Sequence, residues 1–272
     1  MKFIKKGDIV SRDSYGNDIL FKIDSFKKDK NGRTYAILKG LTIRIEADSY
    51  LDDLKKEDKN KIVNYKKKFE RNPSEIIIKN REIKNVINGK ILHLDGDKRY
   101  GIKSSKHYKT LGINATVKFI PEKNQKFYVR NLIKNYKPNI LVITGHDAIL
   151  KGAKDYNNIE SYRNSRFFMD TVLEARKEVR SMDELPIFAG ACQSFFEGII
   201  SSGANFASSP NRILIDFVDP LVIASKIALT DDSKYITMQD LEKLLSSEKG
   251  GIGGRYARGQ QRNIWKNWKK DK

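Results

Sequence analysis

The sequence predicts an α/β protein in which a mostly parallel sheet carries helices on both faces and follows a small β-barrel. Three observations predict this fold class. Short alternating segments separated by turn residues fill positions 1–54. From position 85, short apolar runs alternate with stretches of helical periodicity, as in a parallel sheet with crossover helices. Two of the runs, 140–143 and 185–189, are nearly continuous, which is typical of strands buried on both sides.

The first 54 residues contain four segments in which apolar and polar side chains alternate. In the second segment Ile19, Phe21 and Ile23 fall on one face, which is the period of a half-buried strand. The pair Asn31-Gly32 before the third segment is a hairpin signal. We therefore expect an SH3-like β-barrel, with strands at 6–12, 18–26, 34–40 and 41–47.

Two charged segments flank the main α/β region, which spans residues 85–248. Residues 55–84 are rich in Lys, Asn and Glu with Pro73 among them, which indicates a charged linker or helix. Residues 249–272 are basic and lack periodicity, so we expect a flexible, exposed tail. The glycines of this tail follow no predicted strand, and a dinucleotide-binding loop there has little support.

Between positions 85 and 248 the apolar runs and helical stretches follow one another in order. Phe168, Val172, Ala175 and Val179 recur at helical spacing and predict a core-facing stripe. The expected strands lie within 86–97, 114–120, 139–147, 185–194 and 204–220. The expected helices lie at 104–111, 121–136, 160–179, 195–202, 220–229 and 237–246.

Composition limits the class of protein. The chain has 272 residues, enough for one large or two modest domains, and 39% of them are hydrophobic, which argues against wholesale disorder. No run approaches the length of a membrane span, and the basic N-terminus has no secretory pattern, so we expect a cytoplasmic protein at synthesis. The single cysteine, Cys192, excludes an internal disulfide, and three histidines beside it cannot complete a Cys/His zinc cluster. We expect neither a metal nor a cofactor.

The net charge of +19 is distributed unevenly along the chain. Residues 98–137 hold eleven Lys and Arg against one acidic residue, whereas residues 183–248 hold four against ten. Aromatic residues interleave with the basic segment, as they do in nucleic-acid binders. The interpretation that we favour is a solvated, lysine-rich surface, so nucleic acid is not the expected partner.

Reactive side chains follow three of the predicted strands. Asp95 and Asp97 end the first strand, His146 follows the third, and Cys192 follows the fourth. The carboxyl ends of parallel strands meet at one edge of a sheet, so these groups are expected to lie together. A cysteine nucleophile needs a base or cation to hold the thiolate, and backbone N–H donors for the oxyanion. A helix expected from residue 195 would begin close to the thiol.

A lone cysteine after an apolar strand is also found as an inert core thiol. The polar run 144–147, which closes the neighbouring strand, favours a catalytic pair instead. All three histidines precede Cys192, so the papain order and that of a glutamine-amidotransferase elbow are both excluded. His146 precedes Cys192 by 46 residues, which is the arrangement of caspase-type proteases.

Four stretches of the sequence resemble the YabG family of sporulation-specific cysteine proteases: GDIVSRDSYGNDILFKI, LHLDGD, LVITGHD and FAGACQSFFEGIISSGANFASSPNRILI. The resemblance covers almost the whole chain. It implies a protease that cleaves after arginine in spore coat and cortex-associated proteins, with His146 and Cys192 at the catalytic positions. It also implies association with the developing spore coat.

A looser resemblance extends to the caspase, gingipain and clostripain group. There a glycine follows the histidine and helps to form the oxyanion hole, whereas here Asp147 follows and Gly145 precedes. We expect the backbone amides of Cys192 and Asp147 to bind the oxyanion, provided that the Asp147 carboxylate points away.

An arginine-specific pocket needs a carboxylate. Asp95 and Asp97 are the first candidates, although Asp95-Gly-Asp97 is also compatible with an ordinary turn; Asp219 and Asp147 are alternatives. In the basic tail, Arg255 and Arg258 are expected sites of self-cleavage.

The two other histidines have structural interpretations. His93 alternates with apolar residues and is expected to be a packed core histidine, while His107, among lysines, is expected to face solvent. Two alternative functions remain at this level. One is a nucleic-acid-associated module that uses the barrel and the basic segment, and the other is a non-catalytic spore-coat adaptor.

Overall fold

The structure is a computed structural model that describes residues 4–68, 85–247 and 249–264 of the 272-residue chain. The chain forms two compact units, residues 1–71 and residues 72–272, each with its own buried side chains. The two units are described separately below.

The N-terminal unit is a five-stranded antiparallel sheet with the order β4-β3-β2-β1-β5. The hairpin between β2 and β3 closes around Gly32, whose φ of 79° lies in the left-handed region that glycine readily adopts. Buried apolar side chains, among them Val10, Phe21 and Leu38, line one face. The strands are β1 (Ile9–Arg12), β2 (Phe21–Lys28), β3 (Thr34–Gly40), β4 (Glu46–Tyr50) and β5 (Leu54–Lys56).

The expected SH3-like barrel is not confirmed: β4 and β5 are the edge strands of this sheet, and within residues 4–68 no strand pairing joins them. The fourth strand begins at Glu46 rather than at residue 41, and β5 is a three-residue strand whose pattern is too short to recognise in the sequence. The charged segment 55–84 contains α1 (Lys59–Lys68), while its residues 69–84 lie outside the described part of the chain.

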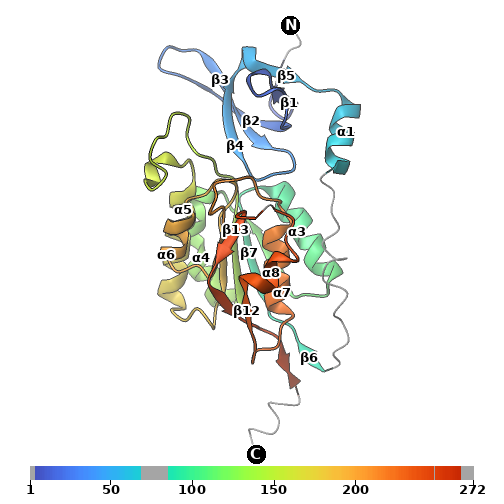
Figure 1. Ribbon diagram of the computed structural model, residues 1–272, viewed down its shortest axis with the longest axis vertical. Helices are drawn as coiled ribbons and strands as arrows, with labels where there is room; N and C mark the ends of the chain where they lie inside the picture. Colours follow the sequence, from blue (N-terminus) through green and yellow to red (C-terminus); the bar gives the residue numbers. More distant parts are fainter. Residues whose placement is uncertain (1–3, 69–84, 248, 265–272) are drawn as a thin grey trace, which may run out of the picture. The chain divides into compact units, whose positions relative to one another are not determined.

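The second unit is built on a six-stranded sheet with the order β13-β11-β10-β9-β7-β8 (Figure 1). Every neighbouring pair is parallel except β11 and β13, so the expectation of a mostly parallel sheet is confirmed. The strands are β7 (Ile91–Asp95), β8 (Ala115–Phe119), β9 (Ile140–Thr144), β10 (Ile187–Ala189), β11 (Phe206–Ser208) and β13 (Ile252–Gly254).

Helices cover both faces of this sheet. On one face α3 packs against α7, and on the other face α5 packs against α4 and α6 (Figure 1). The predicted stripe of α5 is confirmed, because Phe168, Val172 and Ala175 are fully buried against the sheet. The helices are α3 (Lys98–Thr110), α4 (Glu122–Tyr136), α5 (Ser165–Glu178), α6 (Phe196–Ser201), α7 (Asp219–Ala228) and α8 (Met238–Glu242).

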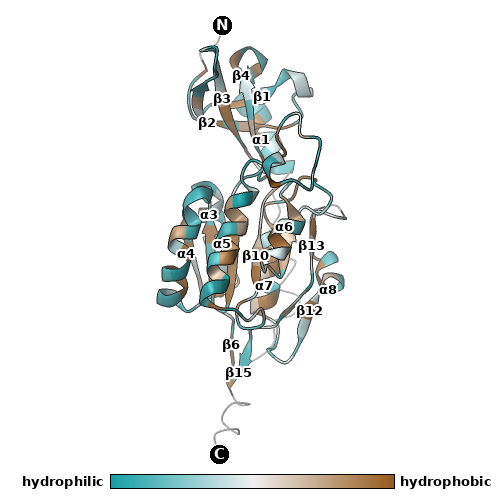
Figure 2. Cartoon of the chain, turned by 90° about the vertical axis from the view of Figure 1, so that its left-hand side faces the viewer, coloured by the Kyte–Doolittle hydropathy of each residue, from teal (hydrophilic) through white to brown (hydrophobic). Residues whose placement is uncertain are grey.

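The hydropathy colouring shows the same division between core and surface. The brown, apolar strands lie inside, while α4 and α5 turn teal, polar sides outward (Figure 2). The apolar face of α4 contributes Val129 and Ile133 to the cluster that α5 completes. The two amphipathic helices α4 and α5 pack on one face of the sheet, and both begin at its carboxyl-end edge.

The expected flexible tail is wrong for residues 252–263, which form strands. Ile252–Gly254 is β13 and pairs with β11 in the central sheet. Antiparallel pairing also joins β14 (Tyr256–Arg258) to β12 (Tyr235–Thr237), and β15 (Arg262–Asn263) to β6 (Val86–Ile87). These partners lie far away in the sequence, so local periodicity does not reveal the strands.

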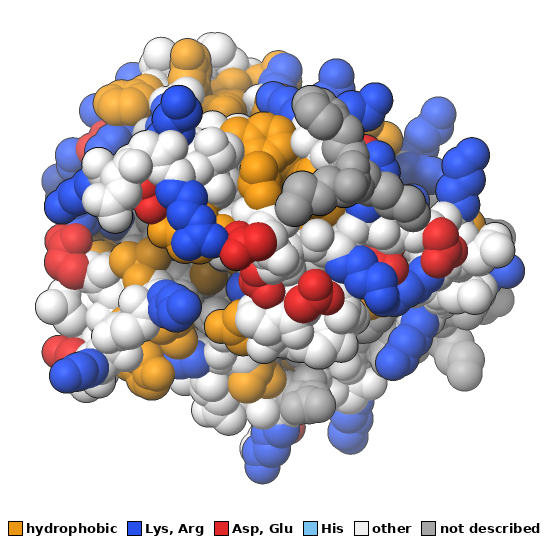
Figure 3. Space-filling model, turned by 90° about the horizontal axis from the view of Figure 1, so that it is seen from above, with side chains coloured by type: hydrophobic (Ala, Val, Ile, Leu, Met, Phe, Trp, Pro, Cys, Tyr) orange, Lys and Arg blue, Asp and Glu red, His pale blue; other side chains and the backbone are white. Residues whose placement is uncertain are grey.

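Among the described residues, no helix combines the length and the apolar character that crossing a bilayer requires. On the face shown in Figure 3, Lys and Arg side chains spread over the surface with carboxylates among them. No continuous basic stripe of described residues crosses that face.

Candidate functional site

The central sheet brings the two expected catalytic residues to neighbouring strand ends. β9 and β10 are parallel and adjacent, with Ile143 opposite Ala189. His146 follows the end of β9 by two residues and Cys192 follows the end of β10 by three. Neighbouring strands lie about 4.8 Å apart. The two residues therefore leave the sheet side by side at its carboxyl-end edge.

Hydrogen bonds join the loops that carry these two residues. The Ser194 hydroxyl donates to Asp147 Oδ2 at 2.9 Å and accepts from the Ala191 amide at 2.9 Å. The Gln193 side-chain oxygen accepts from the Ile149 amide at 3.3 Å. These contacts fix the position of one loop against the other on either side of His146 and Cys192.

The Asp147 carboxylate is the centre of this connection. It is fully buried and accepts hydrogen bonds from the Ala148 and Asn164 amides and from the Ser165 and Ser194 hydroxyls. Burial raises the pKa of Asp147 to about 6, although those four donors act in the opposite direction. The carboxylate is thus held by α5 and by the loop that carries Cys192.

Cys192 lies in a tight turn and has no exposed surface. Gly190 starts the turn with a φ of +116°, and a Cβ at that position would overlap Ser208 Oγ, so only glycine fits. The Ile215 amide donates to Cys192 Sγ at 3.4 Å. The chain around Ile215 therefore covers the thiol.

The imidazole of His146 is also fully buried and lies between two carboxylates. Its Nε2 is 3.6 Å from Asp97 Oδ2, and its Nδ1 is 4.0 Å from Glu122 Oε1. The Tyr100 ring lies beside it, with the ring centroids 5.7 Å apart. The end of β9 therefore carries a buried imidazole with two acidic neighbours, and the neighbouring strand end carries a buried thiol.

Glu122 is not among the site residues that the sequence predicts. This residue begins α4 directly after β8, and its carboxylate accepts a hydrogen bond from the His146 amide at 2.8 Å. A signal was present, because Glu122 is the single acidic residue in the basic segment 98–137. Its place beside His146 depends on how α4 packs, which the sequence pattern does not specify.

The three candidate arginine-pocket carboxylates have different surroundings. Asp95 is fully buried and accepts from the Asp97 amide and the Thr144 hydroxyl. Asp219 is fully buried and accepts from the amides of residues 246 and 247. Asp97 caps α3 through the Arg99 amide and pairs with the Arg99 guanidinium, with Nη2 at 2.6 Å from Oδ2.

The ionisation of Asp97 reflects these neighbours. Burial, the largest influence, raises the pKa of Asp97, but the Arg99 hydrogen bonds and the charges of His146 and Arg99 outweigh it. The pKa of Asp97 is therefore held well below its ordinary value, and the group is a carboxylate at neutral pH.

The two other histidines serve packing. His93 is fully buried and contacts the Tyr108 and Thr144 hydroxyls, as the sequence predicts. The expectation for His107 is wrong, because only 6% of this residue is exposed. His107 faces α7, where the Ser225 hydroxyl is 3.5 Å from Nε2, and burial lowers the pKa of His107 to about 4. Neighbouring lysines indicated solvent, but the packing of α3 against α7 decides its burial.

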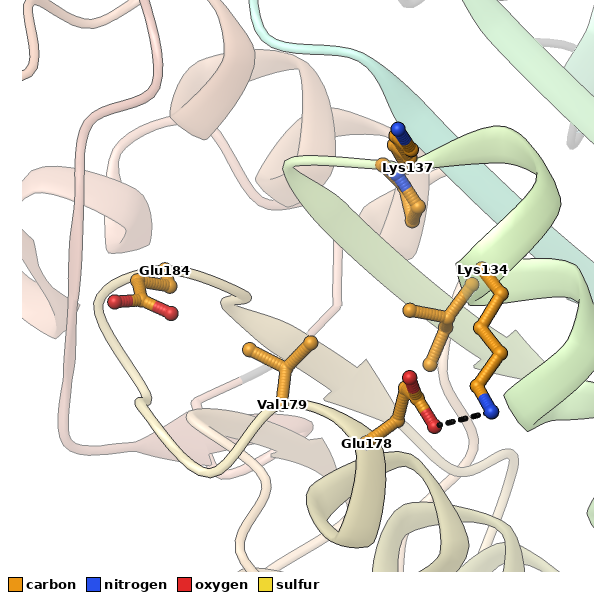
Figure 4. Close-up of a pocket in the computed structure, with 7 residues that line it drawn as sticks. Lys134, Lys137, Glu178, Val179 and Glu184 are labelled. Carbon is orange, nitrogen blue, oxygen red and sulfur yellow. Dashed lines mark ion pairs between the residues drawn. The ribbon is translucent and has the colours of Figure 1, made fainter.

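A surface hollow lies at the opposite, amino-end edge of the sheet, between the ends of α4 and α5 (Figure 4). Its rim carries an exposed ion pair in which Lys134 Nζ is 3.6 Å from Glu178 Oε2. Its lining includes neither a thiol nor an imidazole. In the described part of the chain, no three His, Cys, Asp or Glu side chains are arranged to hold a metal ion.

Comparison with known proteins identifies the family of this chain. The family described as YabG peptidase U57 matches residues 5–265. A protein of Bacillus subtilis (strain 168), described as "Sporulation-specific protease YabG", is 36% identical to this chain over 274 residues. That alignment covers 93% of this chain and 94% of the relative. With its family match across nearly the full length and a relative of this similarity, the chain belongs to the YabG peptidase U57 family.

Proposed function

We propose that this protein is a cysteine endopeptidase of sporulation, in which Cys192 is the nucleophile and His146 is its proton-transfer partner. One observation carries the proposal. The two residues closely follow the ends of adjacent parallel strands, and the Asp147–Ser194 hydrogen bond holds their loops together. Membership of a peptidase family supports the reaction class, and the chain order of the two residues supports the caspase-like type of dyad.

In the proposed reaction the Cys192 thiol gives its proton to His146, and the sulfur attacks the carbonyl carbon of the scissile peptide bond. The C–N bond then breaks, and His146 passes that proton to the leaving amine. Water attacks the resulting thioester, His146 accepts a proton from that water, and the C–S bond breaks. The products are a carboxylic acid and the Cys192 thiolate, which takes the proton back from His146, so atoms and protons balance.

The negative charge that develops on the carbonyl oxygen needs preorganised donors. The backbone amides of Cys192 and Asp147 are the proposed donors, because both lie in the loops that follow β10 and β9. The Asp147 carboxylate is held by the Ser165 and Ser194 hydroxyls, which supports this role. A carboxylate turned the other way would oppose the oxyanion.

A peptide can reach the sulfur only if the covering chain moves. The amide and carbonyl of Ile215 both lie beside Cys192 Sγ, at 3.4 Å and 3.7 Å. Phe217 stacks on Tyr100, with the ring centroids 5.4 Å apart, next to His146. In this proposal the segment 213–218 shifts, and the substrate main chain takes the place of Ile215 beside the thiol.

For the arginine preference, Asp97 is the candidate carboxylate that the geometry supports best. It lies at the His146 side of the site and already holds a guanidinium, that of Arg99, through two oxygen atoms. A substrate arginine would compete with Arg99 for Asp97. Asp95 and Asp219 remain alternatives, although the carboxylate oxygens of both accept hydrogen bonds from backbone amides of the protein itself. The proposed substrates are spore coat and cortex-associated proteins.

The Cys192→Ala variant tests the function. We expect purified wild-type protein to cleave an arginine-containing spore-protein extract and a fluorogenic arginyl peptide, and the variant to cleave neither. Circular dichroism and thermal melting establish that the variant is folded, and a lysyl peptide tests the arginine preference. Cleavage that persists in the folded variant would end the proposal.

Self-cleavage at Arg255 or Arg258 is a further part of this proposal. Arg258 lies in β14, and Arg255 joins β13 to β14, so either cut requires these strands to leave their partners. We expect a mass loss in wild-type protein that is absent from Cys192→Ala, measured on the intact chain. A constant wild-type mass over days would contradict it.

A further inference from the structure

The first turn of α4 is fastened to the loop that carries His146. Glu122 Oε1 accepts from the His146 amide at 2.8 Å, and Gln125 Nε2 donates to the Thr144 carbonyl at 3.0 Å. Both side chains are more than nine-tenths buried. Two polar groups, one turn apart on the same helix, thus hold the main chain on either side of Gly145.

The space for Glu122 is provided by two glycines. A Cβ at Gly96 or at Gly145 would overlap the carboxylate of Glu122. Gly96 follows β7 and Gly145 follows β9, so the carboxylate lies between the ends of two neighbouring strands. Any larger residue at either position would displace it. The placement is therefore specified by the sequence at three separate positions.

The charged and titratable groups around the His146 ring come from several elements. Asp97, from the turn before α3, faces Nε2 at 3.6 Å and also pairs with Arg99. Tyr100 of α3 lies against the ring face, and the buried Asp147 carboxylate is bonded to serine hydroxyls. Glu122, from α4, faces Nδ1 at 4.0 Å. The adjacent strand end supplies the Cys192 thiol.

We propose that Glu122 is a positioning residue of the peptidase, which fixes the main chain at His146 and places a negative charge beside its imidazole. This inference rests on the proposed function. A buried imidazolium is costly unless opposite charges face it. The ion pair of a cysteine thiolate and an imidazolium is such a case, so a carboxylate from α4 favours the protonated ring.

The Glu122→Gln variant separates these two effects, because its side-chain oxygen still accepts from the His146 amide while its charge is gone. We expect a fold like that of wild type and a tenfold or greater loss of kcat/KM at pH 8. We also expect the alkaline limb of kcat/KM against pH to move to lower pH, because the ring loses its proton more easily.

Matched variants control for a purely structural effect. Gln125→Ala removes the hydrogen bond from Gln125 to the Thr144 carbonyl of the same loop and does not change the charge. The alkaline limb of kcat/KM against pH should then stay at the same pH. Glu122→Asp keeps the charge on a shorter side chain, and it should restore much of the limb position. This variant also keeps the test informative if Glu122→Gln proves poorly folded.

A second readout does not depend on activity. The chain has three histidines, so the His146 ring resonance can be assigned by NMR from its absence in His146→Gln. In a Cys192→Ala background, Glu122→Gln should lower the titration midpoint of His146 by about 1 pH unit, the scale of an opposite charge at this separation. Gln125→Ala should leave that midpoint where it is.

The outcomes distinguish this inference from the proposed function. Wild-type protein without Cys192-dependent cleavage would remove the proposed function and this inference with it. Cys192-dependent cleavage together with an unchanged alkaline limb or an unchanged His146 midpoint in Glu122→Gln would overturn the role of Glu122 alone.

Discussion

The two edges of the central sheet differ in how they hold charged groups. At the carboxyl-end edge, His146 and Asp147 are fully buried, and Glu122 is nearly so. At the amino-end edge, Lys134 and Glu178 form an ion pair whose side chains are 56% and 20% exposed. The same strands and helices border both edges, so the difference reflects the residues placed there and not the fold.

This contrast indicates which edge of the sheet keeps charged groups whose burial lowers the stability of the fold. Exposed ion pairs contribute between about 0 and 1 kcal/mol, because solvent screens them. Buried carboxylates and imidazoles destabilise a fold by several kcal/mol each unless partners satisfy them. A protein that keeps such groups together at one edge does so for a reason other than stability. The predictions below test this contrast, from the largest expected effect to the smallest.

The largest effect is expected for His146→Gln. Loss of the proton-transfer group should lower kcat/KM for an arginyl peptide by about a thousandfold or more. The melting temperature should change little compared with that loss of rate. His107→Gln is the matched control, because it removes another buried histidine of the same unit and should retain activity. Equal losses of kcat/KM in the two variants would mean that a buried histidine at the carboxyl-end edge matters no more for activity than one buried elsewhere in the unit.

The next effect concerns the link between the two loops. In Ser194→Ala the Ala191 amide loses its acceptor and Asp147 loses one donor. We expect kcat/KM to fall about a hundredfold, because a small misplacement of the nucleophile is costly. The control is Ser202→Ala, since that buried hydroxyl bonds within the α6 region, to the Gly198 carbonyl. Equal rates in the two serine variants would contradict the role of the link.

The sequence predicts the positions of His146 and Cys192 well, for a physical reason. Alternating apolar runs and helical periodicity are local signals, and they define parallel strands whose ends must meet at one edge. The expected helices 121–136 and 220–229 agree closely with α4 and α7 for the same reason. Short stretches of sequence are thus enough to predict that the two residues follow neighbouring strand ends.

The rest of the site depends on packing between distant elements. Glu122 reaches His146 because α4 begins where β7 and β9 end and two glycines leave room for its side chain. The strand at Ile252–Gly254 forms because β11 offers an edge some 45 residues earlier, and glycine-rich sequence carries no strand period. His107 is buried by α7, which follows α3 by more than a hundred residues. Local patterns contain none of these facts.

A smaller effect tests whether the burial of a titratable group is by itself evidence of a functional site. The pKa of His107 is lowered by burial to about 4, so between pH 6.5 and 4 the unfolded chain binds more protons than the folded one. Stability from this group is present above pH 6.5 and is lost as the pH falls toward 4, by roughly 3 kcal/mol.

Urea unfolding of wild type and His107→Gln at pH 7.5 and 4.5 measures this loss. The raised pKa of Asp147, about 6, has the opposite sign in the same window, since its contribution is lost as the pH rises. The difference between the two proteins isolates His107. We expect a flatter pH dependence in the variant with unchanged peptidase activity at pH 8. Equal pH dependence in both would contradict the burial effect.

The smallest effect is expected at the amino-end edge. In Lys134→Ala and Glu178→Gln an exposed ion pair is lost on the rim of the hollow between α4 and α5. Arg130 also lies 3.5 Å from Glu178, so Lys134→Ala leaves the carboxylate with a neighbouring cation. We expect each variant to change the free energy of unfolding by less than about 1 kcal/mol and to leave kcat/KM unchanged.

High salt sharpens this last test, because screening weakens exposed pairs and affects buried ones much less. At 1 M sodium chloride the stability difference between Lys134→Ala and wild type should vanish, while the loss of activity in Ser194→Ala should persist. A large loss of kcat/KM in Lys134→Ala or Glu178→Gln would mean that a charge at the amino-end edge influences the reaction through α4. The first residue of α4 is Glu122. The two edges would then act as one system, and the contrast between them would fail.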